Sequence, residues 1–565
     1  MSSCGISFLA RMLAPTALVI ALSASAQVPT ADVSGSYTGA QTYGLAIATA
    51  AADKSVFAGA KQSSLLRAFA STTPRMIPRH TPHATGALYA ALGAAPPLVA
   101  HTPLAKDQLL TNFDALSSSQ NAAISGFYDT PPDFGLCVGR LQASKVVIEV
   151  INSTFGLYGH DGSLVASFPM SAGFADPNTF SDPVCLWDQE TQSFYMSVIS
   201  CATCTTDTVV DVLVVSSTGA ATTYQFDTSL GATCFGDQPH LGYDHHNVYI
   251  TTDEFCGPTQ NIYSGALLIA ISKSQLVAQA PVANAVAFGP LSLGGIPILT
   301  LQPARSTGID HEYLVNAFPY DAFGNNNTVS TSLGLWSLSG EANVTTGGPV
   351  TLTGSIITSE QYAFPVPAAS TGDGSTPAGS PSYVISEPSL NPDDSRMLQV
   401  QAVDHDGIQL YSSLSSAVSV KGDPSARDGV AWFRIDATKH KVAKQGYVAS
   451  RGQYLLYPAI LNAGDRTAIA FSITSPTLNP SAAYAVTDSD DHGFGSIHMA
   501  AMGTGPHVSF SDVLYGQARW GDYSAATPDL DGENIWLGTQ YIGPPPGGSD
   551  PIDNWGTRVF ELETK

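Results

Sequence analysis

Acidic residues and one mixed cluster are the parts of this chain whose residue types and spacing could do chemistry. The stretch ARWGDYSA brings Arg519, Asp522 and Tyr523 within five positions, just before a strand-like pattern. Similar strand patterns earlier in the chain also begin near an aspartate. Hydrolysis of a glycosidic bond needs two carboxyls facing each other across a sugar, one to protonate the leaving oxygen and one to attack or to activate water. Four aspartates are therefore predicted as catalytic: Asp133, Asp182, Asp237 and Asp522.

Other side chains at the starts of these strand patterns are expected to contact the substrate. An arginine beside the carboxyls would recognise an anionic sugar or keep a carboxylate ionised. The predicted substrate-binding residues are Arg519, Tyr523, His240 and Tyr457. Two other interpretations stay open. Arg519 and Asp522 could tie neighbouring sheets together, and a ring of aspartates could hold a structural calcium or a column of water. No catalytic metal or organic cofactor is predicted.

Short strands separated by Gly, Asp and Asn turns follow one another from about residue 121 to the C-terminus. One unit runs KVVIEVINSTFGLYGHDGSLVASF, with a hairpin turn at Asp161-Gly162. Units of this kind recur roughly every 50–80 residues, a spacing typical of propeller blades. We therefore predict an all-β fold, a β-propeller of about seven four-stranded blades with an N-terminal extension. The C-terminal TRVFELE strand should close the ring by pairing with an early strand. A β-sandwich with insertions is the main alternative.

Composition excludes one large class of partner. The 565 residues carry 23 Lys+Arg against 46 Asp+Glu, a formal net charge of -23, and only 12% of residues are charged. Binding to nucleic acid needs a positive field that this balance does not supply. The expected partner is instead a polysaccharide or glycan, and the protein is expected to be a monomer.

The first 26 residues have the pattern of a secretory signal peptide. Arg11 supplies the positive charge, MLAPTALVIALSASA is a short apolar stretch, and Ala24-Ser25-Ala26 is a small-residue cleavage site. The apolar run is short for a membrane anchor, which is the competing interpretation. We expect cleavage after Ala26 and a secreted protein, extracellular or periplasmic, with no membrane contact after cleavage. Residues 27–120 are predicted to be an N-terminal extension or pro-segment, and residues 121–565 the propeller domain.

Six cysteines remain after the predicted cleavage, since Cys4 leaves with the signal. An even number in an exported chain indicates disulfides. Six cysteines allow 15 pairings, of which proximity in the chain favours Cys201 with Cys204 and Cys234 with Cys256, leaving Cys137 with Cys185. A zinc or redox site at the C-x-x-C of SCATCTT is the alternative, although no second C-x-x-C and no flanking histidine accompany it.

Four stretches carry a resemblance to a known family: PPDFGLCVG with the strands after it, DPVCLWDQETQSFYMSV, PHLGYDHHNVYITTDEF, and RWGDYSA with IWLGTQYI. Over about residues 125–562 the chain resembles secreted bacterial sialidase-like, or BNR-type, β-propeller exoproteins. This resemblance implies a propeller and export. It does not extend to sialic-acid cleavage, because the Asp-box S-x-D-x-G-x-T-W is absent. The sialidase arginine triad also has no matching context among the candidates Arg140, Arg305, Arg396 and Arg519.

Two functions of different class follow from these patterns. The favoured one is a secreted carbohydrate-active enzyme, a glycoside hydrolase that uses the carboxylates at one mouth of the propeller. The other is a non-catalytic extracellular propeller that binds glycans or proteins.

Overall fold

The computed structural model describes residues 96–102, 109–201, 208–229, 234–257, 262–318, 329–487, 493–510 and 517–564. It also describes the backbone of five short strands: Gly35–Thr38, Gln41–Thr42, Ala46–Thr49, Thr73–Met76 and Leu104–Ala105. The predicted signal peptide, residues 1–26, lies outside the described residues. In the described part no helix is both long and apolar enough to cross a membrane.

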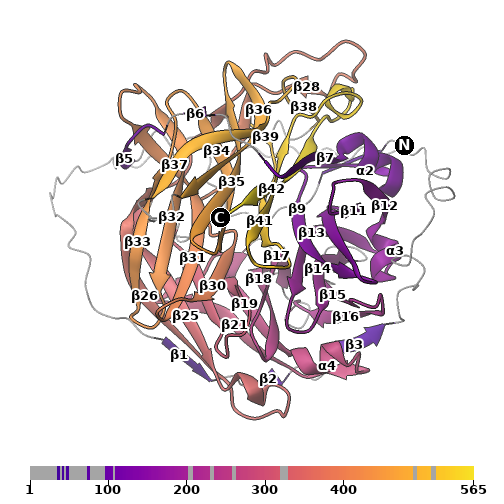
Figure 1. Ribbon diagram of the computed structural model, residues 1–565, viewed down its shortest axis with the longest axis vertical. Coiled ribbons are helices and arrows are strands. Elements are labelled where there is room, and N and C mark those ends of the chain that lie inside the picture. The colour runs from indigo at the N-terminus through magenta and orange to yellow at the C-terminus, as the bar shows by residue number, and fades with distance from the viewer. Residues whose placement is uncertain are drawn as a thin grey trace, which may run out of the picture. The chain divides into compact units, whose positions relative to one another are not determined.

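Seven groups of four antiparallel strands follow one another along the chain, and each group is one blade of a β-propeller (Figure 1). Blade 1 contains β9 (Phe134–Leu141), β10 (Ser144–Ile151), β11 (Thr154–Gly159) and β12 (Leu164–Pro169). Blade 2 contains β13 (Thr179–Asp188), β14 (Ser193–Cys201), β15 (Val209–Ser216) and β16 (Ala221–Asp227). Blade 3 contains β17 (Cys234–Tyr243), β18 (Asn247–Cys256), β19 (Ile262–Ser272) and β21 (Ala285–Leu293).

The remaining blades repeat this plan. Blade 4 contains β23 (Gln302–Ser306), β24 (Tyr313–Ala317), β25 (Val329–Ser339) and β26 (Thr351–Ala363). Blade 5 contains β30 (Val400–Asp404), β31 (Ile408–Val420), β32 (Ala426–Asp436) and β33 (Lys441–Val448). Blade 6 contains β34 (Tyr454–Ala463), β35 (Arg466–Ser475), β36 (Leu478–Thr487) and β37 (Phe494–Ala501). Blade 7 contains β40 (Ala525–Pro528), β41 (Asn534–Tyr541), β42 (Gly556–Glu563) and the early strand β7 (Thr111–Ser117). The inner strands β17, β23 and β30 also pair in parallel over a few residues, which joins blades 3, 4 and 5.

The ring closes through this last blade. β42 pairs antiparallel with β7, with Arg558 opposite Asp114 and Glu561 opposite Thr111. In Figure 1 the violet strand β7 lies against the yellow strand β42. The predicted seven-bladed propeller, closed by the TRVFELE strand, is therefore confirmed.

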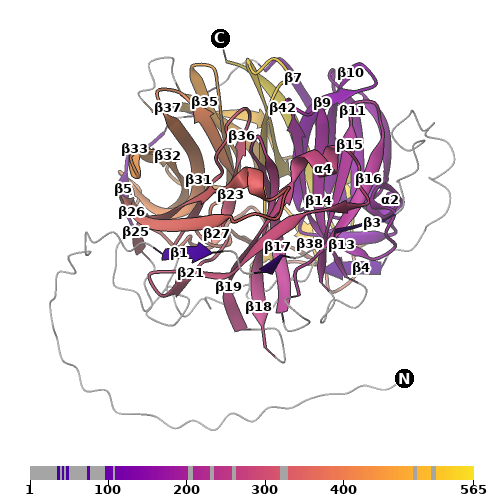
Figure 2. The ribbon, with the colours of Figure 1, turned by 90° about the horizontal axis from the view of Figure 1, so that it is seen from below.

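The apolar core is divided into interfaces between neighbouring blades. Separate clusters of buried side chains lie between blades 1 and 2, 2 and 3, 3 and 4, 4 and 5, 5 and 6, 6 and 7, and 7 and 1. Figure 2 shows the strands of blades 1 and 2 side by side. Because each blade is covered on both faces, its inner strands are buried along their whole length, as in β14 and β17.

Local turn chemistry agrees with the sequence at the hairpin of blade 1. Gly162 has a φ of 82°, and the Asp161 carboxylate accepts a hydrogen bond from the Ser163 backbone N–H at 3.0 Å. The predicted Asp161-Gly162 turn therefore joins β11 to β12.

Short strands from the beginning of the chain add to the outer parts of several blades. β3 (Ala46–Thr49) pairs with β16, β2 (Gln41–Thr42) with β21, β1 (Gly35–Thr38) with β26, and β6 (Leu104–Ala105) with β37. Backbone pairing of this kind covers edge strands that would otherwise present free N–H and C=O groups.

Two of the three predicted disulfides lie within the described residues. Cys137 is bonded to Cys185 and joins the first strands of blades 1 and 2, and Cys234 is bonded to Cys256 within blade 3. Cys201 is also disulfide-bonded, whereas Cys204, its predicted partner, lies outside the described residues.

Candidate functional site

The first strands of the seven blades contact one another around the propeller axis. The four predicted catalytic aspartates stand at the starts of these strands, in blades 1, 2, 3 and 7, which are consecutive once the ring is closed. All four side chains are buried, between 0 and 2% exposed. The chain fold therefore brings together carboxyls that are almost 400 residues apart in sequence.

A repeated backbone irregularity marks the starts of these strands. Asp182, Gln238 and Tyr457 each have a positive φ of about 50°, and each is followed by a proline. The strand register shifts at each of these positions, between Ser181 and Val184 in the first case. Bulges of this type re-aim side chains and recur beside functional sites.

Three of the carboxyls form a compact group. Asp133, Asp182 and Asp522 each contribute a carboxyl oxygen, and these oxygens all lie within 4.8 Å of one another. Burial, followed by the charges of Asp182 and Asp522, raises the pKa of Asp133 well above its ordinary value. Burial, followed by the charges of Asp237 and Asp522, raises the pKa of Asp182 to about 7. Like charges this close cannot all ionise, so the group retains protons at neutral pH.

Asp133 is held by a side chain from the β10–β11 turn. The Asn152 amide donates to Asp133 Oδ2 at 2.9 Å, and the Asp133 backbone N–H donates to Asn152 Oδ1 at 3.2 Å. Asp133 Oδ1 has no hydrogen-bond partner among the described residues. Asn152 therefore binds Oδ2 of Asp133 and does not bind Oδ1.

Arg519 gives one member of the group a positive partner. Its Nη2 donates to Asp522 Oδ2 at 2.8 Å. The guanidinium also opposes the rise in the pKa of Asp133 and of Asp182, although it is outweighed by burial and by the other carboxylates. A charge-assisted contact of this kind favours the ionised carboxylate. Asp522 is thus the carboxyl of the group that has a guanidinium as its direct partner.

The ARWGDYSA stretch does not run straight into the innermost strand of blade 7. Arg519 belongs to a separate short strand, β39 (Ala518–Arg519), which pairs in parallel with β29 (Ser389–Asn391). Gly521 then turns the chain with a φ of 143°, and β40 starts at Ala525. Trp520 is fully buried among side chains of blades 6 and 7, such as Leu456 and Ile542, so it packs as a wedge between these blades.

His240 and Tyr523 lie together deeper in the channel. Their rings meet edge to face, with centroids 5.8 Å apart. Burial, and then the charges of Arg396 and Arg305, lowers the pKa of His240 to about 3, so the imidazole is neutral. Its Nε2 has no hydrogen-bond partner among the described residues. Both rings line a cavity of about 20 Å³, which has room for a water molecule and not for a sugar.

Tyr457 is tied to the backbone of the protein. Its hydroxyl donates to the Asn391 carbonyl at 2.7 Å, and its ring packs in the same apolar cluster as Trp520. The structure therefore places Tyr457 at the same mouth but in the wall, rather than beside the carboxyls.

One residue with the properties of a functional group, Asp253, escaped the sequence analysis. Asp253 lies on β18 opposite Asp237 and accepts hydrogen bonds from the N–H and hydroxyl of Thr300, both at 2.7 Å. Burial raises its pKa to about 6, against the opposing effect of Arg396, whose Nη1 lies 3.8 Å away. The register of the β17–β18 hairpin is the signal that could have found Asp253. The bulge at Gln238 alters that register, and no short sequence motif predicts the bulge.

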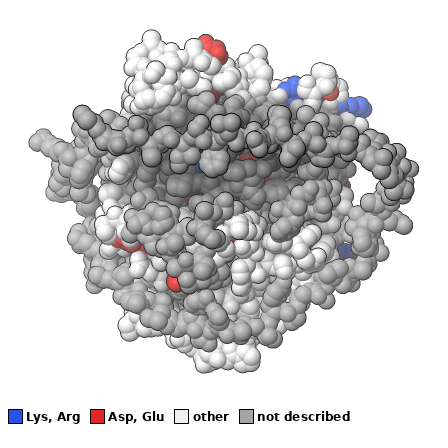
Figure 3. Space-filling view, turned by 180° about the vertical axis from the view of Figure 1, so that it is seen from behind, with Lys and Arg blue, Asp and Glu red and all other residues white. Residues whose placement is uncertain are grey.

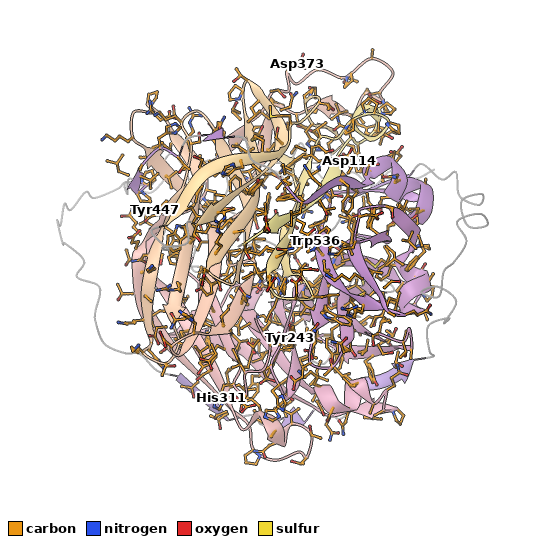
Figure 4. All side chains as sticks on the ribbon, viewed as in Figure 1. Asp114, Tyr243, His311, Asp373, Tyr447 and Trp536 are labelled. Carbon is orange, nitrogen blue, oxygen red and sulfur yellow. A yellow bond between two sulfur atoms is a disulfide. The ribbon has the colours of Figure 1, made fainter. Side chains whose placement is uncertain are left out.

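Figure 3 shows one face of the molecule, on which the described residues are mostly neither acidic nor basic. Figure 4 shows how side chains from all blades fill the space around the axis, with Tyr243 and Trp536 labelled close to it.

Comparison with known proteins gave weak likenesses only. No protein-family model matches the chain, and no curated protein matches its sequence. Among solved structures it is similar to the Dos1 propeller (9% identity, 81% of this chain and 95% of that chain covered, TM-score 0.36). It is also similar to the Hadza microbial sialidase Hz136 (7% identity, 74% of each chain, TM-score 0.36). A third is the alpha-L-arabinofuranosidase PaAbf62A from Podospora anserina (11% identity, 58% of this chain and 91% of that chain, TM-score 0.26). The fold assignment rests on the sheet topology of the chain itself.

Proposed function

We propose that this protein is a secreted glycoside hydrolase whose reacting carboxyls are Asp182 and Asp522. One observation carries the proposal: the oxygens of Asp133, Asp182 and Asp522 converge within 4.8 Å, and their environments differ. Asp522 is paired with Arg519, whereas burial and neighbouring carboxylates raise the pKa of Asp182 to about 7. A carboxyl that keeps its proton beside one that has lost it is the pair that glycoside hydrolysis requires.

In the proposed reaction, Asp182 gives its proton to the glycosidic oxygen as the bond from that oxygen to the anomeric carbon breaks. The Asp522 carboxylate attacks the anomeric carbon and forms a glycosyl ester. Water then attacks the same carbon, the ester bond breaks, and Asp182 takes the proton from that water. The short distance between the carboxyls favours this retaining course, because an inverting pair needs about 6.5–9.5 Å for the intervening water.

The remaining residues of the site have supporting roles in this proposal. Arg519 orients Asp522 through their ion pair, and Asp133 shares the proton of Asp182. Asp237 adds negative charge that helps Asp182 to retain its proton. His240 and Tyr523 support the site as buried rings that pack edge to face, and Tyr457 supports the wall. The partner is a glycan, and no organic cofactor is needed.

Secretion is part of the same proposal. The two described disulfides suit an oxidising compartment, and the predicted signal peptide over residues 1–26 supplies the route.

A polysaccharide panel tests the enzyme directly. The purified protein is incubated with neutral and acidic polysaccharides, and new reducing ends are measured. Asp182→Asn and Asp522→Asn are compared with the control Asp406→Asn. Asp406 lies in an exposed hairpin turn with a positive φ, and asparagine tolerates this backbone conformation. We expect release of reducing sugar by the wild type and by Asp406→Asn, and loss of at least 100-fold in the two site variants. Glycan binding without any release would favour the non-catalytic alternative.

A further inference from the structure

A second cavity lies at the opposite ends of the inner strands from the carboxyls. Its volume is about 550 Å³, within the usual range for small-molecule sites. It is lined by Trp187, Tyr243, Arg305, Gln401, Asn462 and Asp529, one residue from each of blades 2 to 7. Asp182 and Trp187 are five residues apart on β13, so the two sites are roughly 17 Å apart along the channel. Tyr243, which closes β17, is labelled in Figure 4.

Arg305 is the charged group that reaches into this cavity from its inner side. Its Nη1 donates to the Ala526 carbonyl at 2.9 Å. That is the one hydrogen bond its guanidinium makes within the described part of the chain, and no carboxylate there lies within ion-pair distance of it. A guanidinium has five N–H donors and prefers a bidentate carboxylate. The remaining N–H donors of Arg305 are therefore available to a ligand.

Acidic residues at the rim do not serve as its counterions. Asp529 is ion-paired with Lys145 at 3.0 Å and contacts His160 at 3.3 Å. Asp404 and Asp531 are exposed. Burial lowers the pKa of Arg305 to about 10, and the one charge that opposes this effect is that of Tyr243. Arg305 thus stays protonated at neutral pH.

The polar groups of the cavity wall are already paired with one another. The Gln401 amide donates to the Asn462 carbonyl at 3.0 Å and accepts from the Asn462 N–H at 2.7 Å. The Tyr243 hydroxyl donates to the Trp187 carbonyl at 3.2 Å. The indole of Trp187 donates to Gln189 at 3.0 Å. Among the lining residues Arg305 is the single positive group, and the three acidic groups, Asp404, Asp529 and Asp531, stand at the rim.

From this arrangement we propose that the cavity binds a small organic carboxylate through a bidentate contact with Arg305. One guanidinium matches one carboxylate in charge and in shape, whereas a doubly charged phosphate would leave charge uncompensated beside the acidic rim. The proposal uses none of the carboxyls at the other end of the channel, so it stands or falls independently of the hydrolase.

Isothermal titration calorimetry of the full chain with D-glucuronate tests it, with D-glucose and inorganic phosphate as comparison ligands. We expect saturable binding of glucuronate, no binding of glucose, and weaker binding of phosphate. Arg305→Gln should weaken glucuronate binding at least 10-fold, whereas Arg451→Gln, at an exposed position, should leave it unchanged. Absence of glucuronate binding, tighter binding of phosphate, or an unchanged Kd in Arg305→Gln would overturn the proposal.

A second variant covers the case in which Arg305→Gln fails to fold. Thr307 lines the cavity and is exposed, and its hydroxyl lies 3.2 Å from that of Tyr243. Thr307→Glu would supply an internal carboxylate to Arg305 without disturbing the core. We expect this variant to lose glucuronate binding at least 10-fold. Unchanged binding in a folded Thr307→Glu protein would contradict the assignment.

Discussion

Asp522 and Arg519 form a buried ion pair of 2.8 Å across the single turn that Gly521 makes. This pair lies where blade 7 meets blade 1, and it faces two carboxyls that hold protons. The same contact both ties the turn and gives one carboxylate of the group a positive partner, which makes its removal informative.

Replacing Asp522 with asparagine should abolish turnover while the melting temperature changes little. The variant loses the ion pair with Arg519, but it also removes a negative charge that opposes ionisation of Asp133 and Asp182, and the two effects offset each other. Polysaccharide turnover and thermal unfolding measured on the same preparation check this. A large fall in melting temperature with turnover intact would show that Asp522 is a structural tie.

The pH dependence of stability should report on Asp182. Its pKa rises from 3.8 to about 7 on folding, mainly through burial. The folded state therefore binds this proton more tightly than the unfolded state, so the stabilisation is complete below about pH 4 and is lost as the pH rises towards 7. The side-chain amide in Asp182→Asn does not titrate, so its N–H donors are present at every pH. The melting temperature of the variant relative to the wild type should therefore increase between pH 5 and pH 8. A constant difference over this range, like that of Asp406→Asn, would contradict the raised pKa.

Calcium should have no effect on the group of three carboxyls. Three converging oxygens can hold a cation. Here Arg519 and the retained protons already balance the charge, so a calcium ion would have to displace both. We expect the same melting temperature in 2 mM CaCl₂ and in EDTA, to within about 1 °C. A calcium-dependent rise that disappears in Asp133→Asn would instead identify a structural cation site.

Gly521→Ala should destabilise the protein and disturb the site. A Cβ at this position would lie 2.3 Å from the Gln540 amide nitrogen, and the φ of 143° is one that alanine avoids. We expect a loss of roughly 1–3 kcal/mol in the free energy of unfolding, together with a loss of turnover. Gly532→Ala is the control, because its Cβ would meet nothing within 4 Å although its φ is also positive. Equal effects of the two substitutions would show that backbone strain alone matters.

Removing the Cys137–Cys185 disulfide should cost more than removing Cys234–Cys256. The first closes a loop over 48 residues and the second over 22. Loop-closure entropy predicts losses of about 4 and about 3 kcal/mol respectively. Urea unfolding of the two double Cys→Ser variants measures them. The reverse order would show that packing between blades 1 and 2 outweighs the constraint on the unfolded chain.

The periodic parts of the fold were predictable from the sequence. Strand-turn-strand units with Asp-Gly turns such as Asp161-Gly162 depend on neighbouring residues, so the blades and their approximate number follow from local pattern. Closure by the C-terminal strand also follows, because a propeller with an unpaired last blade would leave an open edge. The pair Cys234–Cys256 followed from proximity in the chain, and Cys137–Cys185 was the pair that remained.

The tertiary structure decided the protonation states of the carboxyls and the residues that lie opposite them. Burial and the approach of Asp133, Asp182 and Asp522 to within 4.8 Å set which carboxyl keeps its proton, and both depend on ring closure. The bulges at Asp182 and Gln238 aim side chains and shift register by one residue, which placed Asp253 opposite Asp237. Residue types and spacing thus predicted which aspartates stand at the starts of the inner strands. Their charge states depend on long-range packing, because a pKa responds to the whole surroundings of a group and not to its neighbours in sequence.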